Sequence, residues 1–215
     1  MTKDKLVPLL AILVIAGAVA WIYRSQSATQ KFDLNPYHAL GAGTAEETIK
    51  LLGHQSSLVV ISPDTSEFKN AAVAGQLQSF QDTIQKNKAM SVAATVRFKL
   101  TPMEAMATGG AIPRDQFLKL LQSHPTAGAV VLFCVFPPLA AQDYAALKQS
   151  GIKVVVASAC MPGYRKLVES QVIHLAIVPQ FERPAATKSP PTTLRGWFEQ
   201  DFQVVSAANA ATLPY

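Results

Sequence analysis

The 215-residue sequence lacks the short motifs that identify common enzyme chemistries. It contains no phosphate-binding P-loop, no nucleophile elbow of the form Gly-x-Ser-x-Gly and no Cys-x-x-Cys pair. The run Gly41-Ala42-Gly43 resembles the opening of a dinucleotide-binding fingerprint, but no strand precedes it and Glu46 replaces the third glycine. We therefore predict a protein that is not an enzyme, with no catalytic residues and no cofactor.

Metal ligands and reactive thiols are also scarce. The four histidines are dispersed, and none has a histidine partner four residues away, which argues against a metal site. The two cysteines, Cys134 and Cys160, stand at the ends of predicted strands. An oxidising compartment would permit a disulfide, but neighbouring parallel strands seldom offer the right geometry, so we predict two buried thiols. Cys160 precedes a predicted helix, which would favour a thiolate, yet a structural role is the favoured interpretation.

Charge is sparse as well, because only 15% of the residues are charged. The net charge of +5 is spread along the chain and forms no basic stripe, so we predict no nucleic-acid partner.

Hydrophobic residues, in contrast, gather near the N-terminus. A basic start at residues 1–5 leads into an uncharged run at residues 6–23, which closes with Trp21 and Tyr23. As a helix this run would be roughly 27 Å long, close to the thickness of a bilayer core. We predict a transmembrane anchor that binds membrane lipid, with the N-terminus cytoplasmic and the main domain extracytoplasmic. The alternative is a signal peptide cleaved at Ala20; both interpretations export the domain.

Strand and helix patterns alternate through the middle of the chain. Short apolar runs predict five strands at residues 57–62, 91–99, 128–136, 153–158 and 172–178. Capping residues and helical spacing predict the intervening helices at residues 44–54, 65–87, 101–109, from 113, 140–150 and up to 170. The predicted fold class is α/β: an N-terminal transmembrane helix followed by a single doubly wound, mostly parallel five-stranded sheet. The second strand has a polar face and belongs at an edge, which suggests the flavodoxin-like order 2-1-3-4-5.

The predicted domain lies between two less regular segments. Residues 24–43 are expected to be a spacer, residues 44–182 the extracytoplasmic α/β domain, and residues 183–215 a Pro-rich linker with a C-terminal tail. The tail carries apolar side chains along one face of a short helix, which are Leu194, Trp197, Phe198 and Phe202. These side chains either fold back on the domain or bind a partner protein, and the sequence leaves both alternatives open.

Polar residues follow the predicted strands where doubly wound sheets bind ligands. Asp64 and Thr65 come directly after the first strand, and Lys99 and Thr101 after the second. Asp64 and Thr65 are candidate ligand-binding residues. The alternative is that Asp64 is simply the N-cap of the following helix.

Two stretches resemble one lobe of the type I periplasmic binding proteins, the sugar-receptor family. They are LVVISPDTSEF and GAVVLFCVFPPLAAQDYAALKQSGIKVVVAS. In that family, polar and aromatic residues after the first strand face the ligand, so the resemblance implies Asp64 and Phe68. The family closes two lobes around its solute, whereas only about 140 residues of domain are expected here.

Two hypotheses for function are favoured over a third, an enzyme that uses Cys160 or Asp64. The first is a membrane-anchored, non-catalytic subunit or adaptor that binds protein partners, or a second copy of itself, through its α/β domain and aromatic tail. The second is a single-lobe domain of the periplasmic-binding-protein type that binds or senses a small-molecule solute.

Overall fold

The computed structural model describes two separate units of the chain, Met1–Asp33 and Leu34–Tyr215. The described residues are 15, 17, 18, 21, 33–53, 55–66, 70–157, 161–180 and 190–213. In the first unit, the described positions from Ile15 to Trp21 are helical, and the predicted anchor otherwise lies outside the described residues. No helix in the described part of the chain is both long and apolar enough to cross a bilayer.

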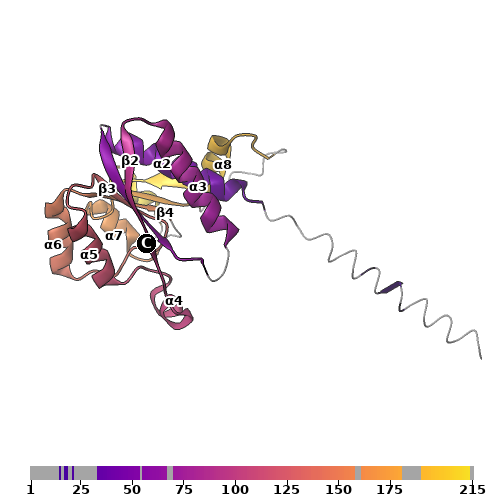
Figure 1. Cartoon of the computed structure of the whole chain (residues 1–215), viewed down its shortest axis with the longest axis horizontal. Coiled ribbons are helices and arrows are strands. Elements are labelled where there is room, and N and C mark those ends of the chain that lie inside the picture. Colours follow the sequence, from indigo (N-terminus) through magenta and orange to yellow (C-terminus); the bar gives the residue numbers. More distant parts are fainter. Residues whose placement is uncertain are drawn as a thin grey trace, which may run out of the picture. The chain divides into compact units, whose positions relative to one another are not determined.

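The second unit is built on a six-stranded sheet of order β2-β1-β3-β4-β5-β6 (Figure 1). The strands are β1 (Ser56–Pro63), β2 (Met90–Phe98), β3 (Ala129–Leu132), β4 (Lys153–Ala157), β5 (Leu175–Pro179) and β6 (Phe202–Val205). Strands β1 to β5 are parallel, whereas β6 pairs antiparallel with β5. The predicted α/β class, the order of the first five strands and the edge position of β2 are confirmed.

The predicted count of five strands is wrong, because the tail adds a sixth. Residues 202–205 pair with residues 176–179 of β5. A strand of four residues is too short to show a clear period of two. Its pairing depends on a neighbour that is distant in sequence, so the sequence pattern indicates only a continuation of the tail.

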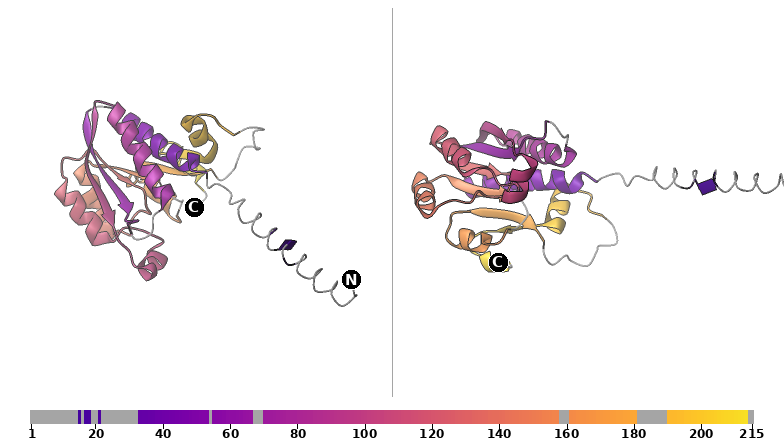
Figure 2. Two further views of the ribbon diagram at one scale, coloured as in Figure 1. Left: turned by 45° about the vertical axis from the view of Figure 1, so that its right-hand side comes forward. Right: turned by 90° about the horizontal axis from the view of Figure 1, so that it is seen from below.

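Helices cover both faces of the sheet (Figures 1 and 2). They are α2 (Asn35–Leu52), α3 (Ala71–Lys86), α4 (Pro102–Thr108), α5 (Arg114–Ser123), α6 (Ala141–Ser150), α7 (Tyr164–Glu169), α8 (Leu194–Asp201) and the 3₁₀ turn η1 (Ala210–Thr212). Successive strand residues alternate between the faces: Leu58 and Val60 pack with α2, α3 and α8, whereas Val59 and Ile61 pack with α5, α6 and α7. Two apolar cores therefore sandwich one sheet.

Helix α2 begins nine residues before the predicted start at Thr44. Thr44 is buried in the helix interior, and its hydroxyl donates to the Leu40 carbonyl at 2.6 Å, so it caps nothing. Glycine permits the close packing of this extension, since a Cβ on Gly41 would overlap the Gln76 backbone and one on Gly43 would overlap the Phe198 ring. Residues 35–43, which the sequence pattern assigns to the spacer, are thus a packing surface of the domain.

Helix α3 also begins away from its predicted cap. Asn70 is the N-cap, and its side chain accepts hydrogen bonds from the backbone N–H groups of Ala72 and Val73. The Asp64 carboxylate instead accepts from the Ser66 N–H at 2.9 Å, a local turn that ends before the helix. The alternative that Asp64 caps the following helix is therefore wrong.

Other local signals were predicted correctly. Thr101 and Glu104 form the reciprocal capping box of α4, and Gly151 ends α6 in the left-handed conformation at φ 71°. Each of these features depends on hydrogen bonds or on backbone conformation within a few residues, so the local sequence predicts it.

Candidate functional site

The order of the strands marks a switch point between β1 and β3. From β1 the chain moves to β2 on one side, and from β3 it moves through β4 to β5 on the other. In open sheets of this kind ligands bind outside the carboxyl ends of the strands, near the point where the direction reverses. The segments at that end include residues 64–66 after β1 and 99–101 after β2.

A hollow of about 440 Å³ lies at this carboxyl end. It is lined by Asp64, Ser66, Lys99, Leu100, Thr101, Pro102 and Glu104. The Asp64 N–H donates to the Phe98 carbonyl at 2.8 Å, which holds the ends of β1 and β2 together. Both segments that line the hollow are therefore positioned by the sheet.

Asp64 supplies a negative charge to this hollow. The hydrogen bond from the Ser66 N–H, followed by that from the Ser66 side chain, lowers the pKa of Asp64, and the charges of Lys99 and Arg97 add to the effect. The Lys99 Nζ lies 3.8 Å from Asp64 Oδ2. An ionised carboxylate and an ammonium group thus stand side by side, one able to accept hydrogen bonds and the other able to donate them.

Glu104 is engaged in the capping of α4. Its Oε2 accepts from both the N–H and the hydroxyl of Thr101, each at 2.8 Å. These two bonds, the backbone one first, lower the pKa of Glu104. Glu104 therefore shapes the wall of the hollow, while Asp64 and Lys99 provide its charged pair.

Ser62 is a further polar residue at the carboxyl end of β1. It is fully buried, and its hydroxyl has no hydrogen-bond partner among the residues that the structure describes. It follows Leu58 and Val60 at a spacing of two, which places it on the α2–α3 face of the sheet. Buried hydroxyl groups in proteins nearly always form a hydrogen bond, so the Ser62 hydroxyl is an unusual feature of this end of β1.

The structure brings together only part of the predicted ligand site. Asp64 lines the hollow, whereas the half-buried Thr65 is absent from its lining. Phe68 lies outside the described residues. The sequence placed Lys99 and Thr101 at a strand end but did not group them with Asp64, because the pairing of β1 with β2 is a tertiary contact.

The predicted partner-binding tail packs on its own domain. Phe198 is only 2% exposed and belongs to the core between the sheet and helices α2 and α3. Trp197 and Phe202 are half-buried against that core, and Leu194 remains 40% exposed. Of the two alternatives left open by the sequence, the structure has the tail folded back; binding of a partner stays a prediction.

Arg195 fixes α8 to α2 at the rim of this contact. Its Nη1 lies 3.0 Å from both Glu46 Oε2 and Glu47 Oε1, and its Nε donates to Glu199 at 2.7 Å. The guanidinium also lies 5.3 Å from the centroid of the Phe198 ring. The cluster raises the pKa of Arg195, with the bond to Glu199 as the largest cause, so the cation persists at every physiological pH.

The described cysteine is unsuited to nucleophilic chemistry. Cys134 is buried and free, and burial raises the pKa of its thiol to about 12. Cys160 lies outside the described residues. Among the residues that the structure describes, no group of three His, Cys, Asp or Glu side chains is placed to hold a metal ion.

Comparison with known proteins gives a likeness of fold. No protein-family model matches the sequence, and no curated protein matches it significantly. Among solved structures, an ABC transporter solute-binding protein from Burkholderia graminis in complex with D-arabinose is 14% identical, with a TM-score of 0.57 over 83% of this chain. The arabinose-binding protein AraP from Geobacillus stearothermophilus is 15% identical, with a TM-score of 0.53 over 81% of this chain. A sugar-binding protein of a sugar ABC transporter from Bacillus halodurans is 14% identical, with a TM-score of 0.54.

These likenesses confirm the resemblance to periplasmic binding proteins at the level of the fold. At 14–15% identity they carry no residue roles. The chain also covers only 62–63% of the length of these three proteins.

Proposed function

We propose that residues 34–213 form a non-catalytic domain that recognises a small hydroxyl-rich solute, with the hollow beside Asp64 as its binding site. The observation that carries the proposal is the Asp64–Lys99 charge pair at the carboxyl end of β1 and β2, next to the switch point of the sheet. A carboxylate can accept hydrogen bonds from two neighbouring hydroxyls of one solute molecule. The ammonium group can donate a hydrogen bond to the oxygen of a third hydroxyl on the same molecule. Sugars present such sets of hydroxyls, and the proteins of similar fold have sugar-binding names.

An open site of this kind is expected to bind weakly. The hollow is walled by one lobe only, so much of a bound solute would stay in water, and affinity depends on how completely a ligand is enclosed. A second wall supplied by another copy or a partner would tighten binding.

The adaptor hypothesis receives less support. Its proposed docking element included Phe198, whose ring is buried inside the domain. We therefore keep solute recognition as the main proposal.

A thermal-shift titration of the full chain tests solute recognition, with D-arabinose, D-glucose and D-galactose as probes. A ligand at ten times its Kd stabilises the native state by about 1.4 kcal/mol, which is a shift of several degrees in Tm. We expect one of these sugars to raise the Tm of the wild type and to have little effect on Asp64→Asn. The asparagine keeps an oxygen for the Ser66 N–H but removes the charge.

Asp82→Asn is the matched control, since Asp82 is exposed on α3 away from the hollow. It should respond as the wild type does. An equal response from Asp64→Asn, or no response to any of the sugars in the wild type, would refute the proposed site.

We further propose that residues 6–23 hold the domain at a membrane, with residues 24–215 extracytoplasmic. The support is the uncharged run of 18 residues bordered by Lys5 and Arg24. After an alkaline carbonate wash of membranes, the full chain should stay in the pellet and a variant without residues 6–23 should not. Recovery of the full chain in the supernatant, or a mature N-terminus just after Ala20, would contradict an uncleaved anchor.

A further inference from the structure

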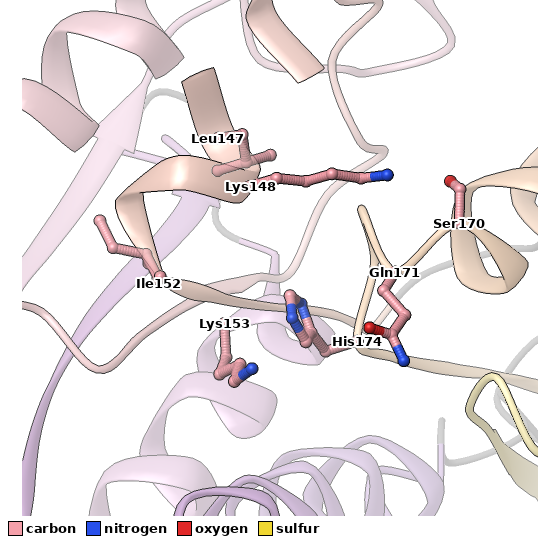
Figure 3. A pocket seen from close by; sticks show the side chains of 8 residues that line it. Leu147, Lys148, Ile152, Lys153, Ser170, Gln171 and His174 are labelled. Carbon is pink, nitrogen blue, oxygen red and sulfur yellow. The ribbon is translucent and has the colours of Figure 1, made fainter. Parts of the chain in front are cut away.

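A second polar hollow, of about 240 Å³, lies at the opposite end of the sheet, beside the amino ends of β4 and β5 (Figure 3). Two connections form it. One joins α6 to β4 and is flanked by Lys148, in the last turn of α6, and Lys153, the first residue of β4. The other joins α7 to β5 and carries Gln171 and His174. The Lys148 side chain extends toward Ser170, and the His174 ring lies between Lys153 and Gln171.

The backbone holds these side chains in place. The His174 N–H donates to the Val154 carbonyl at 2.8 Å, which ties the second connection to β4. Gln171 adopts a left-handed φ of 57°, a conformation that non-glycine residues rarely take. The hollow is therefore formed by the end of α6, the start of β4 and the connection between α7 and β5.

His174 presents a neutral ring with a defined donor. The Val154 N–H donates to its Nδ1 at 3.2 Å, so Nδ1 is the acceptor and the proton resides on Nε2. Burial, together with the nearby charge of Lys153, lowers the pKa of His174 to about 4. At neutral pH the ring thus offers one N–H donor without adding charge.

Positive charge dominates the hollow. Within the described part of the chain, Lys148 and Lys153 form no ion pair, and the nearby Glu169 pairs with Arg165 at 2.9 Å. The carboxyl ends of α6 and α7 face this side and each contributes about half a negative charge at most. Two full ammonium charges exceed that sum, so the field in the hollow favours an anion.

An apolar hollow adjoins the charged one. It has a volume of about 260 Å³, lies between α5 and α6, and includes Leu118, Leu121 and Pro125. It shares Leu147 and Ile152 with the charged hollow. A ligand with a charged head and a short aliphatic part would fit across this common wall.

We propose that the amino ends of β4 and β5 form a phosphate-binding site, in which Lys148, Lys153 and the Nε2–H of His174 hold the phosphate oxygens. The phosphate is either free or attached to an aliphatic group that lies in the adjoining apolar hollow beside Leu118 and Pro125. The site is separate from the hollow at Asp64 and does not depend on the proposed solute.

Calorimetric titration of the full chain with inorganic phosphate, butyl phosphate and butanol tests this site. We expect a phosphate probe to bind the wild type, and the double variant Lys148→Met, Lys153→Met to bind it at least tenfold more weakly. The control is Lys86→Met, Lys88→Met, which removes the same charge from exposed positions near the end of α3 and should change the affinity less than twofold.

The two phosphate probes separate the two sources of the ligand. Tighter binding of butyl phosphate indicates a lipid-like phosphate, and equal binding indicates a free one; either supports the site. The proposal is overturned if neither phosphate probe binds, if both double variants weaken binding alike, or if butanol binds as well as butyl phosphate.

Discussion

Helices α4 and α8 have similar lengths and similar N-caps but differ in how much of each helix is buried. Each has fewer than nine residues and begins at a threonine whose hydroxyl accepts a backbone N–H: Thr101 in α4 and Thr193 in α8. Helix α8 buries Phe198, whereas α4 buries no residue and leaves Met103 and Met106 81% and 87% exposed. In Figure 1, α4 projects from the body of the domain while α8 lies beside α2. Apolar side chains on a capped helix therefore do not determine whether the helix is buried.

The surface that receives the helix makes the difference. Gly43 on α2 leaves the space that the Phe198 ring fills. The helix is also tied at its end, because the Gln180 side chain donates to the carbonyls of Glu199 and Phe202 at 2.6 and 3.2 Å. Helix α4 instead leads into Gly109 and Gly110, both at positive φ, and ends in a turn. This contrast leads to five predictions.

The largest effect should come from Phe198→Ala. Removing a fully buried aromatic ring costs about 3–5 kcal/mol, because the transfer energy is lost and a cavity remains. Urea unfolding of the full chain measures this loss. Phe198→Leu should lose clearly less, since it refills part of the space, and an alanine variant within 1 kcal/mol of the wild type would contradict burial of the ring.

Loss of the two threonine caps should have different effects, one on the stability of the whole domain and the other on α4 alone. Thr193→Ala is expected to lower the free energy of unfolding by about 1 kcal/mol, since α8 is part of the cooperative core. Thr101→Ala should chiefly speed hydrogen exchange in α4, because a helix without buried residues can open alone. Equal changes in global stability from both substitutions would remove the distinction between the helices.

Acid should weaken the α2–α8 contact through Glu47. Burial acts to raise the pKa of Glu47, but hydrogen bonds from Lys50 and Arg195 outweigh it, so the pKa lies below its ordinary value of 4.5. A lowered folded-state pKa gives stability that is fully present above 4.5 and lost as the pH falls below it. The stability difference between wild type and Glu47→Gln should therefore be constant above pH 5 and shrink below about pH 4.5.

Glu104 provides the comparison for this pH effect. Its pKa is also lowered, by Thr101, but α4 buries nothing. Glu104→Gln should change hydrogen exchange in α4 and leave the pH dependence of global unfolding close to that of the wild type. A larger global effect from Glu104→Gln than from Glu47→Gln would show that α4 is part of the cooperative unit.

The smallest effect should come from Met103→Ser combined with Met106→Ser. Both side chains are exposed, so the free energy of unfolding should change by less than about 0.5 kcal/mol for each. Chemical unfolding measures the change. A loss comparable to that of Phe198→Ala would mean that another surface covers α4 in solution.

Part of the candidate site can be predicted from the sequence. Asp64 could be proposed because it directly follows an apolar strand, and the carboxyl ends of such strands are where ligands bind. Lys99 could not be assigned to the same site, since its approach to Asp64 depends on the register of β1 and β2. The charged hollow around His174 left no signal at all, because its lysines are separated from His174 by more than twenty residues and a helix.

The sequence by itself determined the alternation of strands and helices, the edge position of β2, the capping box of α4 and the end of α6 at Gly151. These features depend on side-chain periodicity or on hydrogen bonds within a few residues. Only the tertiary structure decided that α2 starts at Asn35, that residues 202–205 complete the sheet and that Phe198 is buried while Met106 is exposed. The physical reason is that burial depends on a complementary surface, and that surface is formed by residues far away in the chain.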